Sequence, residues 1–158
     1  MSHPAETTPP TLYLNIPSVS PSSAGTFFAS LGFTPVPAYS DGETLSFRLP
    51  APNDSVCLMV HGHKRFKTFM RPTASIPDAK TTTEVLFSIG AQTKEEVDTW
   101  LEKAVKAGGE KDPYVMEGYG EVCGMYVRSF ADLDGHVWEV CAMTGGGSAG
   151  CGGGEKKE

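Results

Sequence analysis

No run of apolar residues in the chain approaches the ~20 that a membrane-spanning helix needs. The first six residues also lack the basic stretch followed by an apolar one that marks a signal peptide. We therefore expect a cytoplasmic protein that has no membrane partner. Basic residues are in the minority, 13 against 19 acidic ones. The net charge of −6 argues against nucleic acid as a partner, because that binding relies on neutralising phosphates.

Cysteine is also scarce: there are four, with no CxxC pair. Cys57 and Cys141 sit inside apolar strand patterns, which favours free thiols over a disulfide framework. The length of 158 residues suffices for one ordinary domain and is too short for two independent cores.

The two ends of the chain differ in composition from its middle. Residues 1–9 are polar and rich in proline, which predicts a flexible N-terminal arm, and residues 145–158 form a Gly-rich tail. Residues 10–144 are predicted to form a single domain of two modules. The first module covers about residues 10–63 and the second about residues 81–144.

The first module is predicted to run strand, helix and three strands. Polar and apolar residues alternate over 11–16, which indicates a half-buried strand, and Pro17 is expected to stop it. Ser20 and Pro21 are typical of a helix start, and Gly32 is typical of a helix end. The three strands are expected at about 34–39, 44–49 and 55–61, with a tight Asp41-Gly42 turn of positive φ between the first two.

The second module repeats this order without repeating the sequence. Residues 84–90 alternate like a strand, and Thr93 followed by two glutamates predicts a helix start. The helix should end at Gly108, and Asp134-Gly135 should form the last hairpin turn. Its buried stripe is predicted to be Val97, Trp100, Leu101, Ala104 and Val105. The three strands are expected at about 113–117, 123–130 and 136–143.

Two segments carry a resemblance to a known superfamily. FFASLGF at residues 27–33 and SFADLDGHVWEV at residues 129–140 resemble motifs of the glyoxalase/bleomycin-resistance/extradiol-dioxygenase (vicinal oxygen chelate) superfamily. Residues 14–17, 66–69 and 82–86 resemble a glyoxalase-like branch without an assigned reaction. The resemblance implies an α+β fold of two βαβββ modules, whose curled mixed sheets form a concave cleft.

The same resemblance implies a place for a divalent metal. The four ligand positions of the superfamily fall on Thr11, Met59, Glu84 and Glu139. Thr and Met are poor ligands for a hard cation. Strand parity puts His61 on the same face as Met59, so one divalent metal held by Glu139, Glu84 and His61 is one hypothesis. Without a metal, Glu84 and Glu139 are instead candidates for the general acid and base.

Further residues are candidates for contact with a substrate. Strand parity places several side chains of the first module on the cleft side, and the orientation of Arg128 stays open. The basic segment 64–71 is either an exposed linker or a flap whose cations attract an anionic substrate. The predicted substrate-binding residues are Tyr13, Asn15, Met59, His61, Lys67, Phe69 and Arg128.

Three functions remain open from the sequence. The first is a metal-dependent lyase, isomerase or dioxygenase. The second is a metal-free enzyme that moves protons with its two glutamates. The third is a metal-free protein of the bleomycin-resistance type, which binds or sequesters a small anionic or aromatic molecule. A homodimer that pairs across exposed sheet edges is a further prediction.

Overall fold

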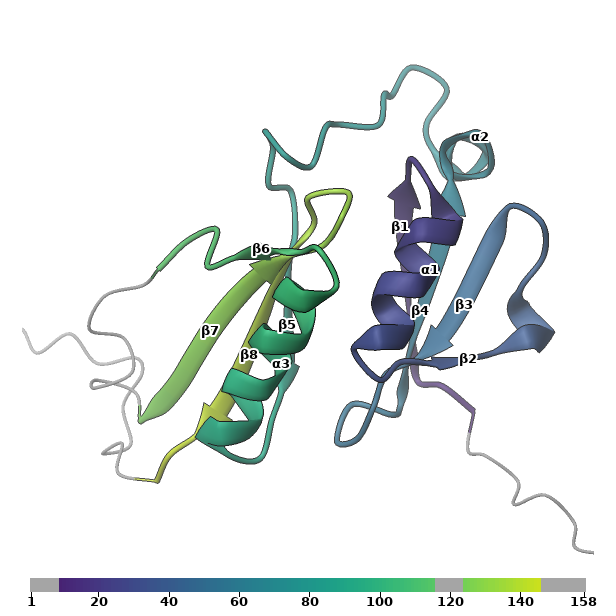
Figure 1. Cartoon of the computed structure of the whole chain (residues 1–158). Coiled ribbons are helices and arrows are strands. Elements are labelled where there is room, and N and C mark those ends of the chain that lie inside the picture. Colours follow the sequence, from purple (N-terminus) through teal and green to yellow (C-terminus); the bar gives the residue numbers. More distant parts are fainter. Residues whose placement is uncertain (1–8, 116–123, 146–158) are drawn as a thin grey trace, which may run out of the picture. The chain divides into compact units, whose positions relative to one another are not determined.

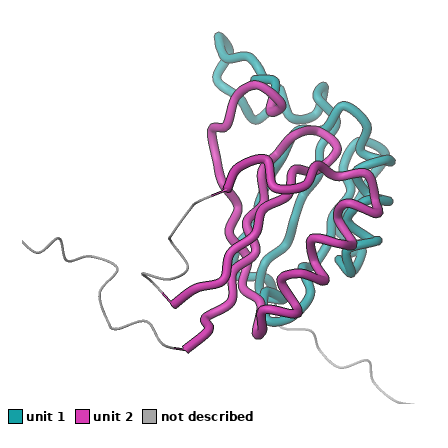
Figure 2. The backbone as a smooth tube through the Cα atoms, turned by 60° about the vertical axis from the view of Figure 1, so that its left-hand side comes forward, with its two compact units in different colours: residues 1–78 teal, residues 79–158 magenta. Residues whose placement is uncertain are grey.

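The computed structural model describes residues 9–115 and 124–145 (Figure 1). The predicted arm and tail therefore lie almost entirely outside the described residues. The chain divides into two compact units, residues 1–78 and residues 79–158 (Figure 2). Among the described helices, none is long and apolar enough to cross a membrane.

Unit 1 is a helix packed on a four-stranded sheet. Its strand order is β1-β4-β3-β2, with β1 parallel to β4 and the other pairs antiparallel. Three short helical turns complete it: η1 (Pro37–Tyr39), α2 (His63–Phe66) and η2 (Lys67–Phe69). The main elements are β1 (Leu12–Ser18), α1 (Pro21–Ser30), β2 (Thr34–Pro35), β3 (Thr44–Arg48) and β4 (Val56–Gly62).

Unit 2 has the same topology. Its strand order is β5-β8-β7-β6, and β5 runs parallel to β8. The elements are β5 (Leu86–Gly90), α3 (Lys94–Lys106), β6 (Glu110–Lys111), β7 (Met125–Ala131) and β8 (Val137–Met143). The predicted α+β fold of two βαβββ modules is therefore confirmed.

Local signals fix both long helices as predicted. The Ser20 hydroxyl accepts a hydrogen bond from the Ser23 N–H, and the Thr93 hydroxyl accepts one from the Glu96 N–H. Gly32 ends the first helix with a φ of 96°, a conformation that glycine adopts without strain.

The core of each unit lies between its helix and one face of its sheet. In unit 1, Phe28 of α1 packs on Phe47 of β3, and both are buried with Leu58 of β4. In unit 2, the rings of Phe130 and Trp138 stack at 6.2 Å on the side of α3. Successive residues of a strand point to opposite faces, so every second side chain is left for the face away from the helix.

One strand end and one turn of unit 1 differ from the predictions. β1 continues through Pro17, which pairs with His61 of β4. The proline is tolerated because β1 is an edge strand of its sheet, with hydrogen bonds on one side only. Gly42 is not among the described glycines of positive φ. Instead, Asp41 Oδ1 accepts the N–H groups of Glu43 and Thr44, both at 2.8 Å, and this side chain makes the turn.

The second module also departs from the expected boundaries. The strand predicted at 113–117 is wrong for residues 113–115, and residues 116 and 117 lie outside the described part. The strand at this place in the order is β6, which comes earlier in the chain and has only two residues. It ends there because Asp112 turns the chain with a φ of 46°. Val105 is 42% exposed and does not belong to the buried stripe. Cys57 and Cys141 are free thiols, as predicted.

Candidate functional site

Glu139 lies at the centre of a polar cluster on the face of unit 2 opposite α3. In the sheet it is paired with Ser88 of β5 and with Ser129 of β7. The Ser88 hydroxyl donates to Glu139 Oε2 at 2.5 Å, and the Tyr114 hydroxyl donates to Oε1 at 2.6 Å. The Ser129 hydroxyl in turn donates to the Tyr114 carbonyl oxygen at 2.8 Å. Both carboxylate oxygens of Glu139 are therefore held in place.

The groups around Glu139 are kept neutral. Burial raises the pKa of the Tyr114 hydroxyl, and the hydrogen bond to Glu139 and the charge of Glu139 raise it further. Burial likewise raises the pKa of the Cys141 thiol, with a smaller contribution from Glu139. An ionised carboxylate only accepts hydrogen bonds, so both hydroxyls can donate to it. The cluster thus presents one carboxylate held by neutral donors.

Glu84 does not join this cluster. It is exposed and precedes β5, which begins two residues later than predicted. The β5 residue opposite Glu139 is Ser88, about 13 Å farther along an extended chain than Glu84. In the described part of the chain, no hydrogen bond joins the two glutamates. Among the residues that the structure describes, Glu139 is therefore the single carboxylate of the cluster.

His61 is the centre of a second polar cluster, on the face of unit 1 opposite α1. It is buried, and its Nδ1 and Nε2 lie 2.9 Å from Thr44 Oγ1 and 2.9 Å from Asn15 Oδ1. A neutral imidazole satisfies both contacts when Nε2–H donates to Asn15 and Nδ1 accepts from Thr44. The ring of Phe69 packs edge-on against the imidazole, with 5.1 Å between the two ring centroids. Both nitrogens of His61 are therefore already engaged.

Burial lowers the pKa of His61, and the positive charge of Arg65 lowers it further. The neutral imidazole consequently stabilises the folded protein above the ordinary pKa of about 6.5, and this contribution is lost as the pH falls through the folded value.

We expect the imidazole resonance of His61, assigned by its loss in His61→Gln, to titrate below pH 6.5 in an NMR titration of the folded protein. The free energy of unfolding should fall over the same acidic range. A midpoint at or above 6.5 would contradict the buried, hydrogen-bonded state.

The other predicted residues of unit 1 surround this cluster. Met59 is paired with Asn15, and its sulfur accepts a hydrogen bond from the Ser46 hydroxyl at 3.1 Å. Tyr13 is exposed and meets the ring of Tyr39 edge-on at 6.0 Å. Five of the predicted residues thus lie on or against one sheet face: Tyr13, Asn15, Met59, His61 and Phe69.

The basic segment after β4 folds into α2 and η2. Lys64 pairs with Glu43, and Arg65 pairs with Asp41 and Glu43. Lys67 forms no salt bridge with any residue that the structure describes, and it shares η2 with the exposed Phe69. Lys67 is thus a cation of this segment that has no carboxylate partner among the described residues and lies close to an exposed ring.

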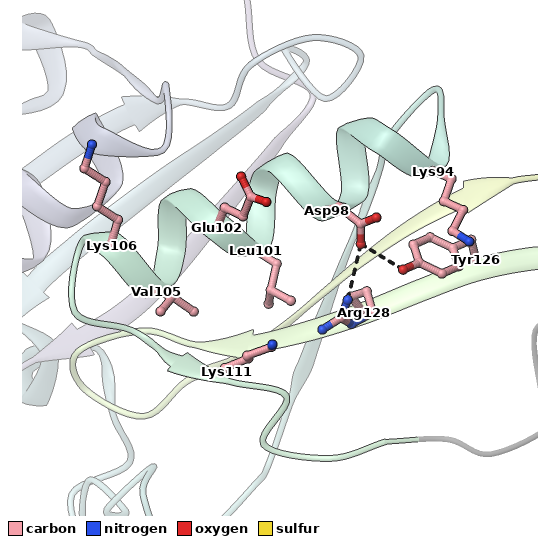
Figure 3. A pocket seen from close by; sticks show the side chains of 9 residues that line it. All are labelled: Lys94, Asp98, Leu101, Glu102, Val105, Lys106, Lys111, Tyr126 and Arg128. Carbon is pink, nitrogen blue, oxygen red and sulfur yellow. Dashed lines mark hydrogen bonds and ion pairs between the residues drawn. The ribbon is translucent and has the colours of Figure 1, made fainter.

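Arg128 lies on the other face of its sheet from Glu139. It alternates with Ser129 along β7 and points toward α3, where its guanidinium contacts Asp98 at 3.2 Å (Figure 3). The guanidinium also contacts Asp112, the residue that follows β6, at 2.6 Å. The parity of β7 therefore turns Arg128 to the helix side of its sheet, and its contact with a substrate stays a prediction.

Neither a family model nor a curated protein matches the chain. Solved structures do. The hypothetical protein SA1046 from S. aureus is 24% identical, with a TM-score of 0.64 over 82% of this chain and 91% of that one. A glyoxalase/bleomycin resistance protein/dioxygenase from Nocardioides is 20% identical, with a TM-score of 0.63 over 91% and 89%. The chain has the fold of the glyoxalase/bleomycin resistance/dioxygenase superfamily. The fosfomycin resistance protein FosX from Listeria monocytogenes shares this fold, at 17% identity and a TM-score of 0.59 over 84% and 89%.

The metal that the glyoxalase fold implies does not fit the residues present. At the first-module positions, Thr11 donates its hydroxyl to the Ser55 carbonyl oxygen, and Met59 offers a soft sulfur. Both nitrogens of His61 are hydrogen-bonded, and Glu84 lies outside the cluster that holds Glu139. Within the described residues, no group of three His, Cys, Asp or Glu side chains is arranged to hold a metal ion. Most of these residues form hydrogen bonds with other groups of the protein, and they do not form a metal-binding site.

Sequence reasoning missed four members of the two clusters: Ser88, Ser129, Tyr114 and Thr44. Ser88 shares the predicted face of its strand, but the register that sets it against Glu139 is not visible in the sequence. Tyr114 lies in an irregular segment without periodicity. The one available signal was that Ser88, a hydroxyl residue, lies on the strand face that was predicted to carry Glu84.

Proposed function

We propose that this protein is a glyoxalase-like enzyme of the lyase or isomerase type, which moves a proton on a small polar or anionic molecule without a metal. The observation that carries the proposal is the geometry of Glu139. Its carboxylate is half-buried, lies on the sheet face opposite α3, and is oriented by two neutral hydroxyl donors. A carboxylate fixed in this way is preorganised as a general base.

The proposed step is a proton transfer. An acidic C–H or O–H bond of the substrate breaks, the proton goes to a carboxylate oxygen of Glu139, and the electron pair stays on the substrate. Return of the proton to a different atom completes an isomerisation, and loss of a leaving group from the anion completes an elimination. Ser88 and Tyr114 stay protonated throughout and keep the carboxylate in place.

A second candidate function is binding without chemistry, and the His61 cluster favours it. His61 has no free nitrogen to act as a base, whereas Tyr13 and Phe69 are 44% and 59% exposed. Phe69 shares η2 with Lys67, which forms no salt bridge within the described residues. Exposed rings and such a cation suit an aromatic anion, which would stack and pair without reacting. This arrangement supports sequestration of the bleomycin-resistance type.

A single screen separates the two candidates. The protein is mixed in D₂O with a panel of small carboxylic acids and carbonyl compounds that have an acidic C–H, with and without EDTA. Binding is detected by saturation-transfer NMR, and proton transfer by deuterium entering the compound. We expect a ligand that gains deuterium at the same rate in EDTA.

Two results would overturn this proposal. Exchange that stops in EDTA and returns with a divalent cation would establish a metal-dependent enzyme. Saturable binding across the panel without any exchange or turnover would favour the binding protein.

A further inference from the structure

The segment that carries Tyr114 is held from both faces of the sheet by two consecutive residues of β7. On the face of Glu139, the Ser129 hydroxyl donates to the Tyr114 carbonyl oxygen. On the face of α3, Arg128 donates two parallel hydrogen bonds to Asp112, from Nε to Oδ1 at 3.0 Å and from Nη2 to Oδ2 at 2.6 Å. Two-pronged pairs of this kind fix direction as well as distance.

Asp112 is where the segment leaves the sheet. Its N–H donates to the Ser129 carbonyl oxygen at 2.9 Å, and its φ of 46° lies in the left-handed region, which is uncommon for residues other than glycine. The hydrogen bond from Arg128 is the main cause that lowers the pKa of Asp112. The carboxylate is therefore charged at neutral pH, and the ion pair holds a backbone conformation that is otherwise unfavourable.

Pro113 links Asp112 directly to Tyr114. Its ring locks φ near −65°, so the connection between the ion pair and the tyrosine is short and stiff. A rotation at Asp112 would move the Tyr114 hydroxyl away from Glu139 Oε1. Arg128 is itself anchored by α3, where Asp98 accepts from Arg128 at 3.2 Å and from the Tyr126 hydroxyl at 2.8 Å (Figure 3).

We propose that Arg128 is a positioning residue: its ion pair with Asp112, on the face opposite the site, sets the backbone that places the Tyr114 hydroxyl on Glu139. This inference rests on the proposed function for the role of Glu139, but its geometry is testable without a substrate. It gives Arg128 a part in the site without contact with the substrate.

The test follows the ionisation of Tyr114 in protein labelled with ¹³Cζ-tyrosine, with the resonance assigned by its loss in Tyr114→Phe. In the native protein it should ionise well above the ordinary value of about 10. In Arg128→Gln and in Asp112→Asn we expect the midpoint to fall by about 1 pH unit or more, because the bond to Glu139 is lost. Asparagine still tolerates the left-handed conformation, so Asp112→Asn removes the ion pair with little other change.

Two further variants distinguish positioning from a general loosening of the unit. Asp98→Asn removes the charge of the contact with α3 but keeps the ion pair of Arg128 with Asp112, and it should leave the Tyr114 midpoint within about 0.3 pH unit of the native value. Arg128→Lys keeps the positive charge but not the two parallel hydrogen bonds. Its Tyr114 midpoint should therefore lie between those of Arg128→Gln and the native protein.

A native midpoint in both Arg128→Gln and Asp112→Asn would overturn the inference, and so would an equal shift in Asp98→Asn. Absence of deuterium exchange in the unmutated protein would instead count against the proposed function alone.

Discussion

Glu139→Gln is expected to slow deuterium exchange into the bound ligand by about 10²–10⁴-fold, the usual contribution of a general base. The amide has the shape of the carboxylate and keeps an oxygen that accepts from one of the two hydroxyls. It cannot take up a proton from the substrate. The exchange rate is measured by NMR at saturating ligand, and ligand affinity by titration, which should change far less than the rate.

The matched control is Glu84→Gln, which makes the same chemical change at an exposed position outside the cluster. We expect its exchange rate to stay within about threefold of the native one, as for most surface substitutions. A Glu139→Gln protein that retains the native rate would remove the general base from the mechanism. Equal losses in both variants would restore the two-carboxylate hypothesis.

Asp132→Ala is expected to lower the free energy of unfolding by about 3–5 kcal/mol, a large part of the stability of a small domain. Asp132 is buried, and its Oδ1 accepts the N–H groups of three successive residues, Asp134, Gly135 and His136. Its Oδ2 accepts the indole N–H of Trp138 at 3.1 Å. Alanine leaves all four donors without this acceptor in or near the core.

Urea unfolding followed by tryptophan fluorescence measures this loss. Asp132→Asn should fall between the native protein and alanine, because the amide still accepts at one atom but sets a donor against the indole N–H. Asp134→Asn, in the same turn, is the control and should lower the free energy of unfolding by less than about 1 kcal/mol. A cost below 1 kcal/mol for Asp132→Ala would show that the turn does not depend on its aspartate.

The elements that the sequence predicts well are those set by local chemistry. Ser20 and Thr93 cap their helices, and Gly32 and Gly135 adopt the positive φ expected of them. Each of these features depends on a few neighbouring residues. The order of elements in both modules follows from such signals.

The errors arise where distant parts of the chain decide the outcome. Pro17 is compatible with a strand because β1 has a partner on one side only, which depends on the strand order. The short β6 depends on Asp112, whose backbone is held by Arg128 from another strand. Neither partner is close in sequence.

The candidate site shows the same division. Glu139 stands in a recognisable motif, which is why the sequence singles it out, and in the structure it lies at the centre of the cluster. Its partners Ser88 and Tyr114 are brought to it by register and by an irregular segment, neither of which a periodic pattern encodes. Arg128 was ambiguous because both faces of β7 carry polar side chains, so alternation alone does not orient the strand.

The alternation of faces along β4 has an evolutionary consequence. Leu58 and Val60 are fully buried against the helix, whereas Met59 and His61, their immediate neighbours, belong to the polar cluster on the other side. Mutations that change the chemistry of the polar face therefore need not disturb the residues that maintain the fold. In this architecture the polar face can differ while the scaffold stays the same: of two modules with one topology, one carries a hydrogen-bonded histidine on this face and the other an oriented carboxylate.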